Sequence, residues 1–150
     1  MKKCNFCNTK GLENRTLFKN GLLLVILSNT PIVRGHLLIL PKRHVRFFGE
    51  LTGKEQKAIF STIAKMRVFL KKVCGSTGFN FAWNEGADAG QSINHLHIHM
   101  LPRKVGDLGI YKYEPRKFLY RPGPRVLAPK AEFDKLAKMF QLEAKKLFKK

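Results

Sequence analysis

The feature that most constrains this chain is a segment in which histidine alternates with an aliphatic residue three times. The segment runs His95-Leu96-His97-Ile98-His99-Met100. In a β-strand successive side chains point to opposite faces, so the three histidines share one face and the three aliphatic residues share the other. Side chains on one face are spaced roughly 6.6 to 7 Å apart. The aliphatic face predicts a buried side of a strand, and the histidine face predicts a chemical site.

Three interpretations of these histidines compete at this point. A lone histidine is usually structural, and alternating histidines also form a plausible set of metal ligands. The third interpretation is catalysis by an imidazole. Three histidines on one strand face, directly after the Gly90-Gln91 pair, argue against a purely structural role.

Length and composition predict one soluble domain over residues 1–150. A chain of 150 residues, 44% hydrophobic and 26% charged, can bury one sizeable core. The longest apolar run, at residues 22–27, is far shorter than the roughly 20 residues of a membrane-spanning helix. The first residues also lack an apolar signal region. We therefore expect no membrane association and a cytoplasmic location, with three cysteines that suit a reducing compartment.

Hydrophobic periodicity predicts an α+β domain built on an antiparallel sheet of about five strands. Apolar or alternating runs predict strands at residues 22–27, 36–40, 79–83 and 93–101. Thr52 and Glu55 form a capping-box signature, and helical spacing of apolar residues predicts one long helix that ends at Cys74-Gly75. A second amphipathic pattern predicts a C-terminal helix at about 130–150. Prolines and basic residues between these parts predict a basic, irregular arm at about 102–129.

The charge balance indicates a class of partner. Lysine and arginine number 29 against 10 acidic residues, which gives a net charge of +19. Such a field raises the local concentration of polyanions, so nucleotides, polyphosphates or nucleic acid are the natural partners. A generally solubilising basic surface explains the charge equally well.

A glycine-containing connection at residues 84–92 brings amide and hydroxyl donors directly before the histidines, and such donors suit phosphate oxygens. Together, residues 84–103 resemble the signature of the histidine triad superfamily. Residues 35–44 resemble the earlier strand of that family, which carries a fourth histidine, here His36. The resemblance covers roughly residues 4–107. It is nearer to the fragile histidine triad and bacterial dinucleoside polyphosphate hydrolase branches than to the phosphoramidase branch.

The resemblance implies a histidine triad fold that pairs into a homodimer with a continuous sheet and binds a nucleotide or dinucleotide. It implies a nucleotide hydrolase or nucleotidyl transferase that acts at the α-phosphate, and we also expect a divalent cation such as magnesium with the substrate. Carried over by position, the catalytic residues are His97, His99, His95 and His36. The corresponding nucleotide-binding residues are Asn84, Gly90, Gln91, Ser92, Ser28, Asn29 and Phe6.

Individual roles follow from the same resemblance. His97 is the nucleophile, while His99 and Ser92 contact the α-phosphate and assist proton transfer, and His36 supports the triad. A neutral imidazole is a ready nucleophile if the backbone or His95 holds its other nitrogen as N–H. We expect His97 on a solvent-facing side of the strand. Ser28 stands where the family usually has Asp or Asn for the ribose hydroxyls, with Asn29 adjacent.

The Cys4-Asn5-Phe6-Cys7 segment is compatible with a redox pair, two buried small residues or half of a zinc site. Resemblance to zinc-binding family members adds two further ligands. The implied structural zinc site consists of Cys4, Cys7, His44 and His95. Phe6 resembles an apolar residue near the base, although core packing explains it equally well.

Three functions compete at this stage. The first is an enzyme acting on dinucleoside polyphosphates or nucleoside phosphoramidates. The second is a nucleic-acid-binding module that uses the same pocket for a strand end, in deadenylation or repair, and the +19 charge supports it. The third is a silent nucleotide sensor, against which the three histidines argue. The charge is spread along the chain and no appended zinc finger follows, which favours the enzyme.

Overall fold

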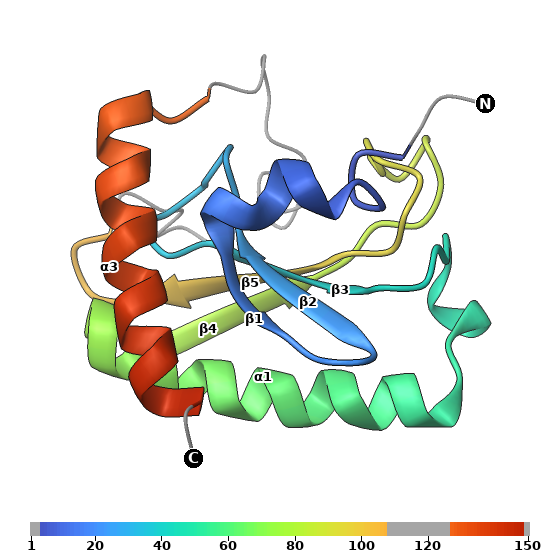
Figure 1. The fold of residues 1–150 in the computed structure, drawn as a ribbon, viewed down its shortest axis with the longest axis horizontal. Helices are drawn as coiled ribbons and strands as arrows, with labels where there is room; N and C mark the ends of the chain where they lie inside the picture. The colour runs from blue at the N-terminus through green and yellow to red at the C-terminus, as the bar shows by residue number, and fades with distance from the viewer. Residues whose placement is uncertain (1–3, 108–126, 149–150) are drawn as a thin grey trace.

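A computed structural model describes residues 4–107 and 127–148 of the chain. Its elements follow in the order η1 Thr9–Arg15, β1 Thr16–Lys19, β2 Leu23–Leu27, β3 Leu37–Pro41, η2 Phe48–Glu50, α1 Gly53–Cys74, β4 Gly78–Ala82, β5 Ile98–Arg103 and α3 Lys130–Phe148. The strands form one sheet in the order β1-β2-β3-β5-β4, with every neighbouring pair antiparallel (Figure 1). The α+β class, the antiparallel sheet, the long helix and the C-terminal helix are confirmed.

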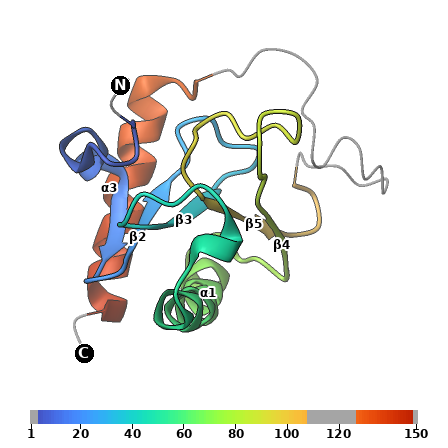
Figure 2. The same cartoon turned by 90° about the vertical axis from the view of Figure 1, so that its right-hand side faces the viewer.

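The sheet separates two apolar clusters. On one face the main core packs against α1 and α3, where the rings of Phe69 and Phe140 meet edge to face at 5.5 Å. Figure 2, with α1 nearly end-on, shows the connection from β4 to β5 on the side away from α1. The second cluster consists of Phe6, Leu12, Leu24, Ile26, Leu38 and Leu40. Strands β2 and β3 are therefore buried on both faces, which explains their continuous aliphatic runs.

Helix α1 begins and ends as its sequence predicts. The Thr52 hydroxyl accepts a hydrogen bond from the Glu55 backbone, and the Glu55 carboxylate accepts one from the Thr52 backbone at 2.8 Å. Glu55 also pairs with Arg43 at 2.9 Å. Gly75 closes the helix in the left-handed conformation, with a φ of 63°.

Helix α3 lies beside the sheet at its β1 edge (Figure 1). It buries Ala137, Phe140 and Ala144 on its predicted apolar face. Its Gln141 side chain donates hydrogen bonds to the carbonyl oxygens of Glu13 and Thr16, at 3.2 and 3.1 Å. The helix therefore covers the edge at which β1 begins.

Two expected boundaries are wrong. The strand expected at 93–101 begins only at Ile98, because Pro41 breaks its pairing. The β3–β5 register joins Ile39 to Ile98, so two residues further along it would join Pro41 to Leu96. Proline has no N–H for the ladder. The Leu96 N–H donates to the Val45 carbonyl at 2.7 Å instead.

The irregular arm was expected at 102–129, and this expected start is too early, because Pro102 and Arg103 belong to β5. Residues 108–126, which hold most of the basic residues of that arm, lie outside the described part of the chain. Strand β1 had no predicted counterpart. Within residues 4–107 and 127–148, no helix combines the length and apolar character needed to cross a membrane.

Candidate active site

The three histidines of the alternating segment lie on the same side of the sheet, although only His99 belongs to β5. Leu96, Ile98 and Met100 pack into the main core on the other side, as the alternation predicts. The expectation that His97 faces solvent is wrong, because His97 is only 6% exposed. The Phe6 ring lies edge to face with the His97 ring, with centroids 5.2 Å apart, and covers it.

A backbone carbonyl fixes the protonation pattern of His97. Its Nδ1 lies 2.7 Å from the carbonyl oxygen of His95. A carbonyl oxygen only accepts hydrogen bonds, so Nδ1 carries the proton in the neutral ring. Nε2 then holds the lone pair, which makes it the nucleophilic nitrogen.

A chain of hydrogen bonds orders the other two imidazoles on this side. The Ile32 N–H donates to Nδ1 of His36 at 3.2 Å, so the His36 proton resides on Nε2. That nitrogen lies 2.9 Å from Nδ1 of His99 and donates to it, which leaves the His99 proton on Nε2. Burial, together with His99 and His97, lowers the pKa of His36 from 6.5 to about 3. His36 is therefore neutral at physiological pH, and His99 presents an N–H donor.

The connection before the histidines is held by its own side chains. The Gln91 amide donates to the Arg46 carbonyl at 2.9 Å and accepts from the Gly86 N–H at 3.0 Å. The Asn84 amide donates to the Gly90 carbonyl at 3.4 Å. Gly90 has a φ of 84°, a conformation that favours glycine. Gln91 thus spans the loop and retains one amide hydrogen for a ligand.

Asn84 lies two residues beyond the end of β4. The last pair of that strand joins Ala82 to His99 of β5. Paired residues of neighbouring strands share a face. Ser92 is exposed at the other end of the same connection.

The candidate ribose contacts lie at the end of β2. Ser28 is buried, its N–H donates to the His36 carbonyl at 2.9 Å, and its hydroxyl accepts from the Thr30 N–H at 3.3 Å. Asn29 is exposed and accepts from the Arg15 guanidinium at 3.4 Å. Arg15 also donates to the Leu27 carbonyl at 3.0 Å, and burial lowers its pKa.

Two cysteines and two histidines gather beside the triad. One atom from each of Cys4, Cys7, His44 and His95 lies within 4.8 Å of all the others. Cys7 Sγ lies 3.3 Å from His44 Nδ1 and 3.6 Å from His95 Nδ1, and Cys4 Sγ lies 3.5 Å from His95 Nδ1. Zinc bond lengths in a tetrahedron give S to N separations of roughly 3.6 Å. The donor set and its spacing therefore fit a zinc ion.

The ring of His95 is oriented for that role. Its Nε2 donates to the Pro41 carbonyl at 2.9 Å, so Nδ1 holds the lone pair and faces both sulfurs. Burial lowers the pKa of His95, which favours the neutral ring that a metal needs. Magnesium prefers oxygen ligands, and residues 4–107 and 127–148 hold no further cluster of three or more candidate metal ligands.

Residues 10–106 match the HIT domain family, which takes its name from the histidine triad. The chain belongs to the HIT family. Among curated relatives, a bis(5'-nucleosyl)-tetraphosphatase of Schizosaccharomyces pombe is 31% identical over 63% of this chain. An adenylylsulfatase of Arabidopsis thaliana is 37% identical over 69% of it. The matches span only 52% and 54% of those two enzymes, so the chain covers about half of each.

Solved structures of HIT proteins have the same fold. A histidine triad nucleotide-binding protein of Sulfolobus tokodaii superimposes with a TM-score of 0.76 at 25% identity, over 96% of this chain and 93% of that one. A histidine triad family protein of Mycobacterium smegmatis, described as Zn-bound, gives 0.71 at 22% identity, over 97% and 95%. At that identity the second likeness shows the fold alone.

Sequence reasoning expected the backbone or His95 to hold His97, but it missed the other backbone groups of the HIT site. The Ile32 N–H and the carbonyls of Pro41 and His95 orient three imidazoles, yet none of their side chains marks that role. Arg15 was also missed, because a single arginine before a short strand carries no motif. These groups become visible only once the sheet brings them to the histidines.

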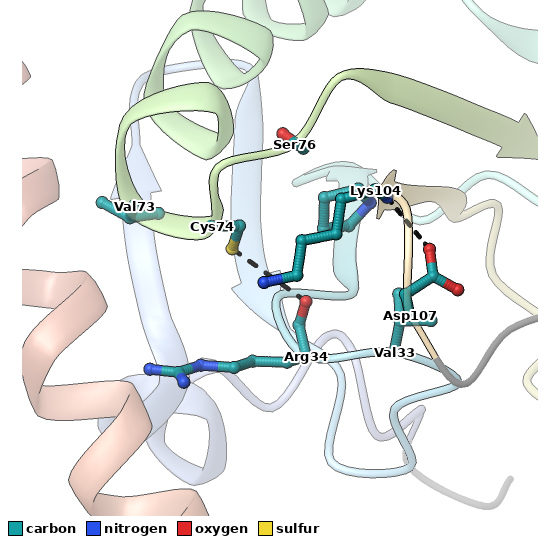
Figure 3. A pocket seen from close by; sticks show the side chains of 8 residues that line it. Val33, Arg34, Val73, Cys74, Ser76, Lys104 and Asp107 are labelled. Atoms are coloured by element: carbon teal, nitrogen blue, oxygen red, sulfur yellow. Dashed lines mark hydrogen bonds between the residues drawn. The ribbon is translucent and has the colours of Figure 1, made fainter.

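Gly35 fixes the loop that carries His36. Its φ is +86°, and a Cβ there would lie 2.7 Å from Cys74 Sγ and 3.2 Å from Pro102 Cγ. Figure 3 shows the adjoining pocket, where the Lys104 side chain extends toward Cys74 and the Arg34 carbonyl. A side chain at position 35 would therefore push the loop away from α1.

Proposed function

We propose that this HIT protein hydrolyses nucleotides at the α-phosphate, with dinucleoside polyphosphates as the substrate class, through a nucleotidyl group on His97. The observation that carries the proposal is the 2.7 Å contact between His97 Nδ1 and the His95 carbonyl, which leaves Nε2 as the nucleophile. The activities in the names of the two curated relatives support it, since both act on compounds with a nucleotide α-phosphate.

The chemistry takes two in-line displacements. In the first, His97 Nε2 forms a bond to the α-phosphorus while the bond to the leaving oxygen breaks, and that oxygen keeps the electron pair. The His97 ring is then cationic, with Nδ1–H against the His95 carbonyl. In the second, water attacks the phosphorus, the P–N bond breaks, its electron pair returns to Nε2, and the proton of water is released. The Nε2–H of His99 donates to a non-bridging oxygen in both steps.

The decisive test is His97→Asn. We expect this variant to bind nucleotide within a few-fold of wild type, while kcat falls on the order of 10⁴-fold or more. Wild-type protein quenched with acid-free denaturant during turnover should carry a nucleoside monophosphate on the peptide that contains His97, detected by mass spectrometry. A His97→Asn variant with near wild-type turnover would refute the assignment.

The leaving group needs its own experiment. The panel comprises diadenosine triphosphate, diadenosine tetraphosphate, adenosine phosphoramidate and adenosine phosphosulfate, with products separated by chromatography. All four present the same adenylyl group to His97, so differences in kcat/KM report the leaving group alone. We expect the dinucleoside polyphosphates to give the highest kcat/KM, and preference for the phosphoramidate would move the protein to the phosphoramidase class.

We propose that Cys4, Cys7, His44 and His95 hold one zinc ion, on the strength of their donor chemistry and spacing. A four-ligand site of this kind supplies structural stability and leaves no coordination position for substrate. Metal analysis of protein purified without chelator should give about one zinc per chain, and less than one tenth in Cys4→Ser. Wild-type protein that was purified without chelator and is fully folded, yet carries no metal, would refute the site.

We also propose a homodimer formed at the β4 edge. Strand β4 ends the sheet opposite β1, and both its Phe81 and Trp83, which follows the strand, are exposed. Phe60 and Val68 of α1 are 64% and 61% exposed, an apolar pair on one helix face at a spacing of eight residues. These exposed apolar side chains and the open edge of β4 together form the surface that we propose a second copy covers. Separately from the dimer, we propose that the protein is located in the cytoplasm, as expected from its sequence.

A further inference from the structure

We propose that the metal site positions the nucleophile and one wall of the nucleotide site, so that metal and nucleotide bind cooperatively through Phe6 and the His95 peptide. The inference rests on the proposed function and on the zinc assigned above. It gives Phe6 and His95 the role of positioning residues, beyond that of a structural anchor.

The first link is His95, which serves both sites at once. Its imidazole faces the two cysteine sulfurs at 3.5 and 3.6 Å, and its Nε2 is anchored to the Pro41 carbonyl. Its own carbonyl oxygen holds Nδ1 of His97 at 2.7 Å. A metal that fixes the His95 ring therefore also fixes the peptide that sets the tautomer of His97.

The second link is Phe6, which lies between the two cysteines in the sequence. Its residue is only 4% exposed, and its ring centroid lies 5.2 Å from that of His97 and 5.8 Å from that of His95. A short turn joins the two cysteines, with the Cys7 N–H donating to the Cys4 carbonyl at 3.1 Å. One metal bond on each side of Phe6, from Cys4 and from Cys7, would therefore hold the Phe6 ring against the nucleophile.

The third link is energetic. Without an ion, weak S to N contacts and the packing of the Phe6 ring join this turn to His44 and His95. With an ion, four metal bonds hold the same three segments in the arrangement that the structure shows. A nucleotide that binds beside His97 and Phe6 selects this arrangement, so it must tighten metal binding by the same factor by which the metal tightens nucleotide binding.

The test measures the effect of AMP on zinc binding and the effect of zinc on AMP binding. AMP is used because it has no phosphoanhydride bond that the enzyme could cleave. Zinc affinity is determined by competition with a chelator, with and without saturating AMP. AMP affinity is determined by calorimetry on zinc-loaded and metal-free protein, at a temperature where circular dichroism shows both folded. We expect a factor of about ten in each direction, equal within error. Two affinities that are each measurable but independent would overturn the inference while leaving the proposed function intact.

Variants separate this coupling from general destabilisation. Phe6→Leu keeps an apolar side chain between the ligands, so zinc affinity without AMP should change less than twofold while the coupling factor falls toward one. Leu12→Ala is the control, since Leu12 packs in the same cluster but lies outside the cysteine turn, and its coupling should persist. If Phe6→Leu weakens AMP binding but keeps the coupling factor, Phe6 contacts only the nucleotide and the inference is wrong.

A spectroscopic measurement completes the test. In zinc-loaded protein the ¹⁵N shifts of His97 should report one tautomer, with the proton on Nδ1. In metal-free, folded protein they should shift toward a mixture of both tautomers. Identical His97 spectra in the two states would overturn the role of the His95 peptide. Absence of any AMP binding, in contrast, would refute the proposed function itself.

Discussion

At the scale of single residues, His36 couples the triad to pH. Its pKa is lowered to about 3 in the folded protein, against about 6.5 for a free imidazole. The folded state therefore binds fewer protons than the unfolded state below pH 6.5. The contribution of neutral His36 to the free energy of unfolding should be fully present above that pH. The free energy of unfolding should then fall by up to about 1.4 kcal/mol per pH unit between pH 6 and 4.

Urea unfolding at pH 7 and pH 5 measures this effect. His36→Gln removes the titrating group, so the loss of stability between the two pH values should be smaller in the variant than in wild type. The pKa of His95 is also lowered, but His95 is present in both proteins and cancels in the difference. Equal pH dependence in the two proteins would mean that His36 is not held neutral.

Gly35 gives a second prediction at this scale. Gly35→Ala should lower the free energy of unfolding by about 1–3 kcal/mol, because its positive φ strains a side chain and the new methyl group would meet Cys74 Sγ at 2.7 Å. Denaturant unfolding measures the loss. Gly49→Ala is the matched control, since a Cβ there meets nothing within 4 Å. A loss as small as that of the control would show that the loop adjusts freely.

The residues that belong to motifs were predictable, and so was a backbone or His95 contact to His97, whereas the backbone contacts to His36 and His95 were not. Alternation placed His95, His97 and His99 on one side of the sheet, and resemblance joined His44 to the cysteines. The burial of His97 could not be predicted, because it depends on Phe6 of a segment distant in the sequence. Side-chain patterns carry no information about such long-range cover.

At the scale of elements, the start of α1 is the sharpest prediction. Thr52→Ala should destabilise the protein by about 1 kcal/mol, since it leaves the Glu55 N–H without its hydroxyl acceptor. Thermal or denaturant unfolding measures the change, and Thr52→Ser should retain most of the stability. A Thr52→Ala variant as stable as wild type would show that water replaces the cap.

Strand boundaries show where elements escape prediction. The alternation of histidine and aliphatic residues continues upstream of Ile98, but pairing stops there because Pro41 on the neighbouring strand has no N–H. β1 escaped notice because it has only four residues, of which Leu17 alone is buried. Helix α1 was predictable because its cap, periodicity and terminal Gly75 agree.

At the scale of the whole molecule, the net charge of +19 suits both nucleotides and nucleic acid. The salt dependence of binding separates these two classes of partner. We expect binding of AMP to weaken only several-fold between 50 and 200 mM salt, since one phosphate releases few counterions. A nucleic-acid module that contacts six or more phosphates would lose about 10³-fold or more over that range. Titrations of AMP and of duplex DNA at both salt concentrations decide between them.

The proposed homodimer gives the other prediction at this scale. Phe60→Glu should shift the protein toward monomer in analytical ultracentrifugation, while circular dichroism remains that of folded protein. Lys138→Glu, an exposed position on α3 and not on the face of α1 that carries Phe60 and Val68, is the control for added negative charge. Trp83 is the only tryptophan of the chain and is 45% exposed, so its emission should move to longer wavelength on dissociation. A wild-type protein that sediments as a monomer would refute the dimer.

The two edges of the sheet differ in whether another strand can reach them. Gln141 of α3 donates to the carbonyl oxygen of Thr16 at the start of β1, whereas in the described part of the chain β4 has a neighbouring strand on one side only. In the proposed dimer, β4 is the one open edge among the described strands, so a copy that pairs there uses up that edge in both partners. Pairing about a two-fold axis is then self-limiting, and growth into a filament is blocked by the same helix that completes the core.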